Sequence, residues 1–228
     1  MLATVAGANE HRRPAAAGVD STMDGTPRGV WTIASRRAFV LGALGSLAGC
    51  ADPENGSGAQ TVAIAPGVIL QLPPPASLGR TIEVAQLIEA RRQGDKIMAF
   101  EARLRIDAQH LLLAVTDTVG RRALTVEWTG SELRSQAADW LPDGLRARNM
   151  LGDIVLLYWP QAVVQTLLSA SGATLVDAPS SRVVRVGERD LVRITYQPDQ
   201  AHVWRGLAHY RNLGWGYDLD IRSSEVGR

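Results

Sequence analysis

The side chains best suited to catalysis or metal binding in this sequence are its histidines, its serines and its single cysteine. After the cysteine, the histidines are His110, His202 and His209, and their spacing matches no metal motif such as H-E-x-x-H. His202 and His209 differ by seven positions, so on one strand they would face opposite sides of the sheet. The sequence has no G-x-S-x-G nucleophile motif and no glycine-rich phosphate loop. We therefore predict that the protein is not an enzyme and has no metal or cofactor.

Two groups of charged residues could bind an ion or a polar ligand. Asp218 and Asp220 share one face of an expected strand and could hold a cation, but carboxylates that alternate with apolar residues are more typical of a solvated face. The second group is a set of arginines on an expected hairpin: Arg182, Arg185, Arg189 and Arg193. Arginine binds phosphate and carboxylate in a bidentate manner, so this cluster could contact lipid head groups. An exposed, charged strand face is the explanation that the pattern favours.

The cysteine, Cys50, ends a segment organised like an export signal. Arg36 and Arg37 precede an uncharged run from Ala38 to Gly49, which is too short to span a bilayer. A charged start, an apolar centre and small residues before the cut are typical of a secretory signal peptide. Because the chain after Cys50 is polar and has no helix or strand pattern, a buried core thiol is the weaker explanation.

The four residues ending at Cys50, Leu-Ala-Gly-Cys, resemble the lipobox of bacterial lipoproteins. The resemblance implies cleavage before Cys50 and acylation of both its sulfur and its new amino group, and two such anchors give lasting membrane attachment. The pair Arg36 and Arg37 also resembles a twin-arginine export signal, with ordinary Sec export as the alternative. Translation could begin at Met1 or Met23. We predict a signal peptide over residues 1–49.

The position of the first acidic residue after Cys50 bears on localisation. In bacteria that sort lipoproteins, Asp directly after the lipidated cysteine retains the protein in the inner membrane. Here Ala51 follows, and Asp52 comes one place later. By this resemblance we predict a lipid-anchored protein on the periplasmic face of the outer membrane.

The composition excludes several other classes of protein. With 228 residues, 46% hydrophobic residues and one cysteine, the chain suits one domain with tails and excludes collagen, low-complexity, disulfide-scaffold and polytopic membrane proteins. Its 24 basic and 23 acidic residues give a net charge of +1, which removes the electrostatic argument for nucleic-acid binding. Lys96 is the only lysine, which we interpret as an effect of genomic composition.

The segment after the cysteine is expected to be a lipidated Cys and a flexible, proline-rich tether over residues 50–79. Residues 51–60 are polar and small, which suits a flexible linker. The three prolines Pro73 to Pro75 favour an extended stretch and disfavour a helix. We therefore expect the folded domain to span residues 80–228.

Within that domain, apolar and polar residues alternate in a way that is typical of half-buried antiparallel strands. The clearest strand runs from Lys96 to Asp107, and the residues around Ile82 to Ile88 form its expected partner. Further strands are expected at about 110–117, 121–129, 131–136, 173–178, 182–187, 190–197, 202–211 and 215–223. Between the two groups, apolar spacing and flanking prolines predict helices over 143–158 and 161–169.

This order of elements predicts a mainly β (α+β) fold in which one curved antiparallel sheet carries helices on one face. Residues 111–115 are apolar at every position, whereas a strand with one wet face should alternate. We therefore expect the helix over 143–158 to cover the sheet.

Several stretches in order resemble a family of bacterial lipoproteins, the domain-of-unknown-function family 3261. They are Leu72–Gly79, Leu141-Pro142, Leu151–Pro160 and Tyr210–Leu219. The resemblance implies a fold similar to that of the periplasmic lipoprotein carrier LolA and its receptor LolB, so that residues 80–228 would be a LolB-like domain. That fold is a half-barrel whose concave face is covered by helices and holds acyl chains. Some members are encoded beside genes for aryl polyene synthesis, and the family has no agreed catalytic residues.

The expected cavity residues lie on and after the main helix, and they are Leu151, Ile154, Val155, Tyr158 and Trp159. The aromatic residues Trp204, Trp215 and Tyr217 could line the cavity or fill the core. The first hypothesis is a membrane-anchored lipoprotein that binds or transfers an acyl or lipoprotein ligand at the outer membrane. The alternative is a non-catalytic structural or assembly lipoprotein that docks a protein partner. An enzyme acting on lipid-linked substrates is a distant third possibility.

Overall fold

A computed structural model of the protein describes residues 61–92, 97–141, 145–199 and 202–226. These residues form a mainly β fold with the helices α1 (Ala147–Tyr158) and α2 (Gln161–Ser169) and a short 3-10 helix, η1 (Pro75–Leu78). The strands are β1 (Thr61–Ala65), β2 (Val68–Gln71), β3 (Ile82–Arg92), β4 (Met98–Ile106), β5 (Leu111–Asp117), β6 (Arg122–Trp128), β7 (Leu133–Ala137), β8 (Thr174–Ala178), β9 (Ser181–Val186), β10 (Arg189–Asp199), β11 (His202–Asn212) and β12 (Tyr217–Glu225).

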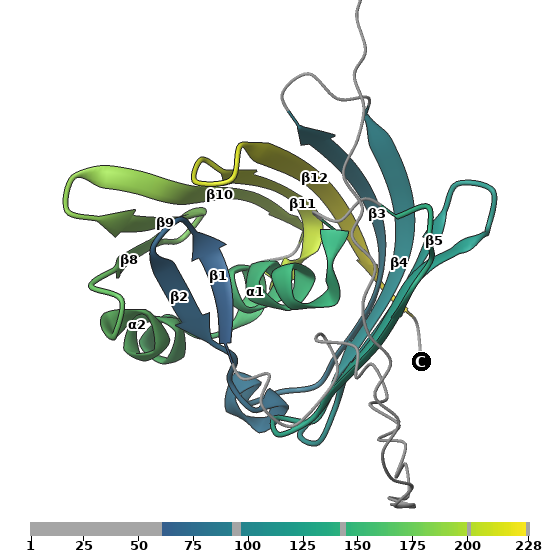
Figure 1. The fold of residues 1–228 in the computed structure, drawn as a ribbon, viewed down its shortest axis with the longest axis horizontal. Helices are drawn as coiled ribbons and strands as arrows, with labels where there is room; N and C mark the ends of the chain where they lie inside the picture. Colours follow the sequence, from purple (N-terminus) through teal and green to yellow (C-terminus); the bar gives the residue numbers. More distant parts are fainter. Residues whose placement is uncertain (1–60, 93–96, 142–144, 200–201, 227–228) are drawn as a thin grey trace, which may run out of the picture. The chain divides into compact units, whose positions relative to one another are not determined.

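Ten of these strands form one open antiparallel sheet in the order β7-β6-β5-β4-β3-β12-β11-β10-β9-β8. It consists of two meanders, one before and one after the helices, and the pairing of β3 with β12 joins them at the centre. The sheet curves around α1, which lies inside the curve next to β1 (Figure 1). These observations confirm the predicted mainly β class, with an antiparallel sheet and helices, and show that the sheet is open.

The alternation along β4 shows how the sequence forms this sheet. Phe100, Leu104 and Ile106 are buried on the concave side, whereas Glu101 and Arg103 are exposed on the convex side. Successive side chains on a strand point to opposite faces, so this pattern places one apolar face toward α1.

Residues 61–79 differ from their expected role as a tether. Residues 61–71 form the hairpin β1–β2, and Val62, Ile64 and Leu70 are buried in the core. The hairpin turns at Pro66-Gly67, where Gly67 has a φ of 76° that few residues other than glycine adopt. The alternation in this segment is therefore that of a strand pair whose apolar face packs on α1, and the domain begins before residue 80.

The proline-rich stretch also belongs to the domain. Pro75 opens η1, a position where the missing N–H of proline does no harm. The indole of Trp128 donates a hydrogen bond to the carbonyl oxygen of Pro73 at 2.9 Å, and that of Trp159 donates to Ser77 Oγ at 2.8 Å. These two buried indoles fasten the stretch across one end of the sheet.

The main helix begins at Ala147, later than the expected residue 143, and residues 142–144 lie outside the described part. It is closely packed: an ideal Cβ on Gly152 would lie 2.9 Å from Val62 Cγ1 of β1. A side chain at position 152 would therefore push the helix away from the hairpin.

The apolar segment at residues 111–115 is covered on one face only. Leu111 and Leu113 are buried on the concave side, as expected beneath the helix, but Leu112 is 40% exposed on the convex side and Ala114 is also exposed. The expectation that a helix buries the second face is therefore wrong for Leu112 and Ala114.

The C-terminal end of α1 is tied to the sheet by side chains from β9 and β10. Arg182 is buried and donates to the carbonyl oxygens of Leu156 and Trp159, at 3.1 and 2.7 Å. It also pairs in a bidentate manner with Asp177. Tyr196 donates its hydroxyl to the carbonyl oxygen of Leu157 at 2.8 Å. These bonds satisfy carbonyl groups that a helix end leaves without an intrahelical partner.

This arrangement corrects the expectation for the arginine cluster. Arg182 is neither a head-group ligand nor part of an exposed face, because it caps a buried helix end. Arg185 and Arg193 both pair with Asp190, and Arg189 is exposed. The position of Arg182 on an expected strand did not indicate that its side chain would lie beneath the C-terminal end of α1.

Candidate functional site

A cavity of about 620 Å³ lies between α1 and the concave face of the sheet. Its lining is mainly apolar and comes from β3, β4, β5 and β12 on one side and from α1 on the other. The apolar lining residues are Ile88, Ala90, Met98, Phe100, Leu113, Val115, Leu219, Ile221, Leu145, Met150, Ile154 and Leu157. Such a concave, mostly apolar space with a few polar groups is typical of a small-molecule site.

Beside the cavity, part of the apolar concave face is incompletely buried. Ile88, Met98 and Leu219 point toward α1 and are only partly buried. On the same face of the sheet, Leu104 and Ile106 are 1% and 0% exposed. The apolar face is therefore completely covered at one end and accessible at the other.

The register between β3 and β12 shows the order of side chains along the cavity. Arg92 pairs with Tyr217 at one end, Ile88 pairs with Ile221 in the middle, and Gln86 pairs with Ser223 at the other end. Six residues of strand separate Arg92 from Gln86, which corresponds to about 20 Å. The cavity thus has an apolar middle section between two polar ends.

The inner polar end is a closed hydrogen-bond network. Gln86 Nε2 donates to the hydroxyl oxygen of Tyr158 at 2.7 Å and to Ser223 Oγ at 2.9 Å. Burial raises the pKa of the Tyr158 hydroxyl, so this group stays neutral at physiological pH. The inner end of the cavity is therefore polar but carries no charge.

The outer polar cluster is built around Asp153, the carboxyl group that α1 presents to the cavity. Tyr210 of β11 donates its hydroxyl to Asp153 Oδ1 at 2.5 Å, and the Tyr217 hydroxyl lies 2.8 Å from both carboxyl oxygens. Asn212 Nδ2 donates to the Tyr217 oxygen at 3.3 Å and to the Ile64 carbonyl at 3.0 Å. One helix and two strands meet at this carboxyl group, and Asn212 connects the cluster to β1.

Burial changes the acidity of this cluster. Removal from water raises the pKa of Asp153 from 3.8 to about 7, and the hydrogen bonds from Tyr210 and Tyr217 act in the opposite direction. Burial and the nearby carboxylate raise the pKa values of both tyrosines, which remain neutral donors. Asp153 is therefore the group in the cavity that changes charge near neutral pH.

The structure places the five expected cavity residues in two groups. Ile154 and Tyr158 line the cavity. Leu151, Val155 and Trp159 are buried on other sides of the helix and are not among the lining residues. The lipidation residue Cys50 and the export residues Arg36 and Arg37 lie outside the described residues.

The two aspartates that could have held a cation are bonded to side chains of neighbouring residues. Asp218 accepts a hydrogen bond from Arg211 at 2.9 Å, and Asp220 pairs with Arg91 and His209. Among the residues that the structure describes, no group of three or more potential metal-ligating side chains is found. The side chain of His202 lies outside the described part, and His110 lies 3.9 Å from both Asp107 and Glu127.

The aromatic residues also divide between core and cavity. Trp215 and Tyr217 line the cavity, and the Trp215 indole donates to the carbonyl of Ala63 at 3.3 Å. Trp204 is partly buried, with the Arg80 guanidinium 4.7 Å from its ring centre.

Asp153 and its partners Tyr210 and Asn212 were not predicted from the sequence to form a site. One signal was present, because Asp153 is the only charged residue between Arg148 and Pro160, in an otherwise apolar helix. Nothing in the local pattern could have indicated the tyrosines, since the sheet order brings them to the helix from more than 50 residues away in the sequence.

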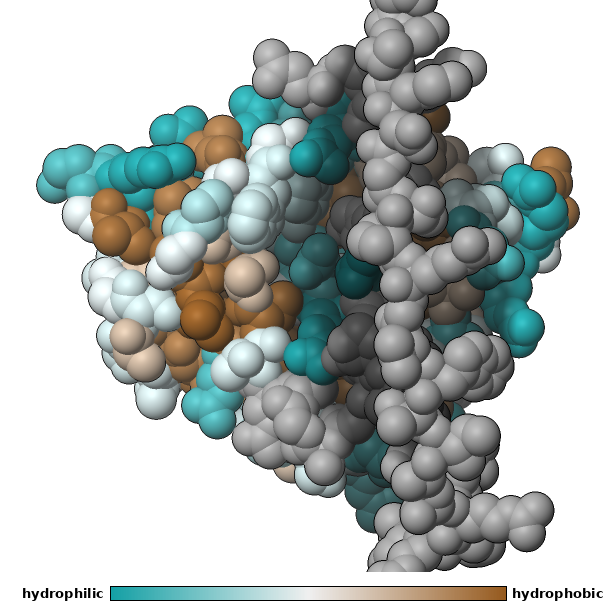
Figure 2. Space-filling model, viewed as in Figure 1, coloured by the Kyte–Doolittle hydropathy of each residue, from teal (hydrophilic) through white to brown (hydrophobic). Residues whose placement is uncertain are grey.

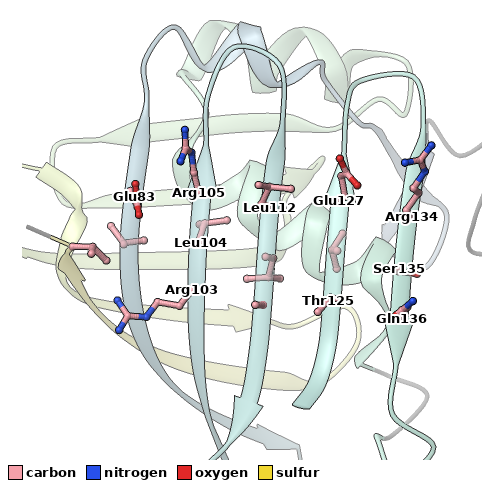
Figure 3. A pocket seen from close by; sticks show the side chains of 15 residues that line it. Glu83, Arg103, Leu104, Arg105, Leu112, Thr125, Glu127, Arg134, Ser135 and Gln136 are labelled. Atoms are coloured by element: carbon pink, nitrogen blue, oxygen red, sulfur yellow. The ribbon is translucent and has the colours of Figure 1, made fainter. Parts of the chain in front are cut away.

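A second depression, of about 700 Å³, lies on the convex face over β4, β5, β6 and β7 (Figure 3). Leu112 lies among charged side chains that include Arg103, Arg105, Glu127 and Arg134 (Figure 3). The three arginines are exposed, which makes this depression a solvated surface and distinguishes it from the cavity under α1.

Comparisons with known proteins agree with one part of the sequence-based identification. No curated protein matches the chain. Within the described residues, no helix is both long enough and apolar enough to cross a membrane. The family described as "Protein of unknown function (DUF3261)" matches residues 83–225, which run from β3 to β12 and include the whole sheet, both helices and the Asp153 cluster. The chain therefore belongs to the DUF3261 family.

Proposed function

We propose that this protein is a lipoprotein, anchored through Cys50 at the periplasmic face of the outer membrane, that binds or transfers an acyl chain. The observation that supports this proposal is the apolar cavity of about 620 Å³ under α1. Its lining side chains Ile88, Met98 and Leu219 are accessible although they lie on the concave face. Accessible apolar surface inside a fold favours an apolar ligand.

The dimensions and chemistry of the cavity suit a chain rather than a compact polar ligand. Its apolar section extends along β3 and β12, with a neutral polar network at the inner end. Each CH₂ group removed from water contributes about 0.8 kcal/mol of binding free energy, so a long alkyl chain gains affinity without directional contacts. Binding and release of such a chain need no nucleophile.

The architecture supports a fold relationship to LolA and LolB, which we include in the proposal. An open antiparallel sheet that curves around a helix is the arrangement expected for a half-barrel carrier. The signal at residues 36–50 and the polar residues 51–60 provide an anchor and a tether ahead of β1.

A docking lipoprotein is the second candidate, and exposed apolar residues outside the cavity favour it. Leu112 is 40% exposed in the convex depression, and Ile69 of β2 is 53% exposed. Hydrophobic surface is also visible over the β1–β2 hairpin (Figure 2). In this second function the apolar cavity would be only a packing defect.

The experiment that separates these functions measures ligand binding to the full chain with Cys50→Ser, which avoids detergent because the proposed lipidation cannot occur. Native mass spectrometry with dodecanol should show one bound alcohol per chain. Ile88→Trp, which fills the cavity, should abolish the adduct. Leu87→Trp is the matched control, because Leu87 is the neighbouring residue on the opposite face of β3 and is 39% exposed.

The outcome for the two variants decides between the functions. Loss of the adduct in Ile88→Trp but not in Leu87→Trp supports the carrier. If dodecanol fails to bind the parent chain, or binds the two variants equally, the carrier proposal is wrong and docking becomes the better account.

A further inference from the structure

Asp153 differs from the other buried or half-buried carboxyl groups of the domain in having no cationic partner. Its side chain accepts hydrogen bonds from Tyr210 and Tyr217, both neutral. Among the described residues, no lysine, arginine or histidine nitrogen lies within 4.0 Å of Asp153. Buried charges in proteins are normally paired with an opposite charge.

Two other carboxyl groups of the domain are less deeply buried than Asp153 and do have arginine partners. Asp177 pairs with Arg182, and Asp190 pairs with both Arg185 and Arg193. Asp153 is buried, whereas Asp177 and Asp190 are only half-buried. Asp177 and Asp190 are thus paired with arginines, whereas Asp153 faces an apolar cavity.

The packing of α1 does not require a carboxylate at this position. An asparagine of the same shape could accept the Tyr210 hydroxyl and would avoid the cost of burying a charge. A group that lowers stability where an isosteric neutral residue would serve is typical of a functional site. The carboxyl group therefore needs an explanation outside the folded chain itself.

The hydrogen bonds leave one carboxyl oxygen able to accept more. A carboxylate has about four acceptor positions, and the two tyrosines supply two protons. Oδ1 accepts from Tyr210, while Oδ2 has only a share of the Tyr217 proton. Because Asp153 lines the cavity, its carboxyl group has acceptor positions left for a donor on a bound molecule.

We propose that the ligand carries a protonated amine, which donates to Asp153 while its alkyl chain extends along Ile88 toward Gln86. This inference rests on the proposed function for the chain and adds the chemical class of the head group. An ammonium group supplies both the missing positive charge and the missing donors. An anionic head group would instead meet a carboxylate of the same sign.

Arg92 lines the same cavity and provides the strongest opposing expectation. It pairs with Tyr217 in the β3–β12 register and is exposed, so it could attract a fatty acid to the rim. Its guanidinium is not among the groups that shift the pKa of Asp153, which are Tyr210 and Tyr217. The rim cation therefore does not replace the absent partner of the buried carboxyl group.

The test compares three ligands with the same chain, dodecylamine, dodecanol and dodecanoic acid, on the full Cys50→Ser chain by calorimetry at pH 8, below their micellar concentrations. We expect the amine to bind at least tenfold more tightly than the alcohol, and the acid to bind most weakly. Asp153→Asn should remove the advantage of the amine, measured as the ratio of the affinities for dodecylamine and dodecanol.

Two matched controls distinguish the buried carboxyl group from general charge. Asp218→Asn removes a carboxylate from β12 that pairs with Arg211 on the convex face, and it should leave the advantage of the amine intact. Arg92→Gln should weaken dodecanoic acid and leave dodecylamine bound at least as tightly. If Asp153→Asn does not fold, the parent chain titrated from pH 8 to pH 5 provides the same test, because protonation of Asp153 removes the negative charge.

The ionisable groups around the carboxyl are Tyr210 and Tyr217, which bond to it, and Tyr158, Arg91 and Arg92, which line the same cavity. Tyr158, Tyr210 and Tyr217 stay neutral over this range because burial raises their pKa values, and the alkylamine stays protonated. The advantage of the amine should therefore fall at least fivefold as the pH drops below about 7.

The results separate this inference from the carrier function. Equal affinity for amine and alcohol, or an amine advantage that survives Asp153→Asn, overturns the head-group assignment while the carrier proposal stands. Failure of all three ligands to bind overturns the carrier proposal itself.

Discussion

The two ends of the concave face show the same alternation of apolar residues, but their side chains differ in how deeply they are buried. At the end closed by the proline-rich stretch, the large side chains are at most 2% exposed, as for Leu104, Ile106, Leu111, Trp128 and Leu133. At the end near Arg92, the corresponding side chains Ile88, Met98 and Leu219 remain partly accessible. Alternation along the strands is therefore enough to produce an apolar face. Whether that face becomes core or lines a cavity depends on the elements that pack against it.

The C-terminal end of α1 is held by Arg182 and Tyr196, which together donate to the carbonyl groups of Leu156, Leu157 and Trp159. The cavity is lined by Asn149 and Met150 near the N-terminal end of α1 and by Ile154, Leu157 and Tyr158 nearer its C-terminal end. The cavity therefore follows the helix up to the end that Arg182 and Tyr196 hold.

The largest expected effect contrasts a tryptophan from each end. Trp128→Ala should lower the free energy of unfolding by about 3–5 kcal/mol, because it removes a buried ring and the hydrogen bond to Pro73. Trp215→Ala should cost about 1 kcal/mol or less, because Trp215 is 42% exposed at the cavity. Urea unfolding of both variants measures the difference, and equal losses would contradict the division into a closed and an open end.

The second prediction concerns the fastened end of α1. Arg182→Ala should cost about 3 kcal/mol, since it leaves Asp177 without its cation and two helix carbonyls without donors. Arg193→Ala, on an exposed arginine that pairs with Asp190, should cost about 0.5 kcal/mol. Thermal unfolding tests this pair. A small loss for Arg182→Ala would mean that the helix end is held by apolar packing alone.

The third prediction is that removing the charge of Asp153 stabilises the folded protein at pH 8. Because the folded state raises the pKa of Asp153 from 3.8 to about 7, the folded protein binds this proton more tightly than the unfolded chain. The resulting stabilisation is complete below about pH 4 and is lost as the pH rises to about 7. Asp153→Asn should therefore be more stable than the parent chain at pH 8, by about 2–4 kcal/mol.

Unfolding at pH 5 and pH 8 provides the control for this prediction. The variant should show a much weaker loss of stability between the two pH values than the parent chain. A variant that is less stable at both pH values would indicate that the tyrosines require a carboxylate for packing.

The smallest expected effect on stability belongs to the cavity lining. Ile88→Ala should cost about 1 kcal/mol of unfolding free energy, because the side chain is already partly exposed, yet it should weaken dodecanol binding about fivefold. Leu87→Ala, on the convex side, should leave the affinity unchanged. Calorimetry and urea unfolding on the same samples check both statements, and a large loss of stability without a loss of affinity would identify Ile88 as core.

Much of the fold was predictable because strands and helices depend on local periodicity. The alternation in β4, the apolar spacing of α1 and the turn residues between strands indicated these elements within a few residues. The hairpin at residues 61–71 was missed because its apolar positions flank a turn and precede three prolines, which together resemble a linker. The candidate site was predictable only in part: Ile154 and Tyr158 line the cavity, whereas Leu151, Val155 and Trp159 face other neighbours.

The sequence by itself determined the mainly β class, the order of strands and helices and the membership in DUF3261, because each depends on residue types at short spacing or on motifs in order. Only the tertiary structure decided that part of the apolar face is a cavity, that Arg182 caps a helix and that Asp153 meets Tyr210 and Tyr217. These features join residues that are 23 to 64 positions apart. Burial patterns record that a side chain faces inward, but the register of the strands and the path of α1 decide what it meets there.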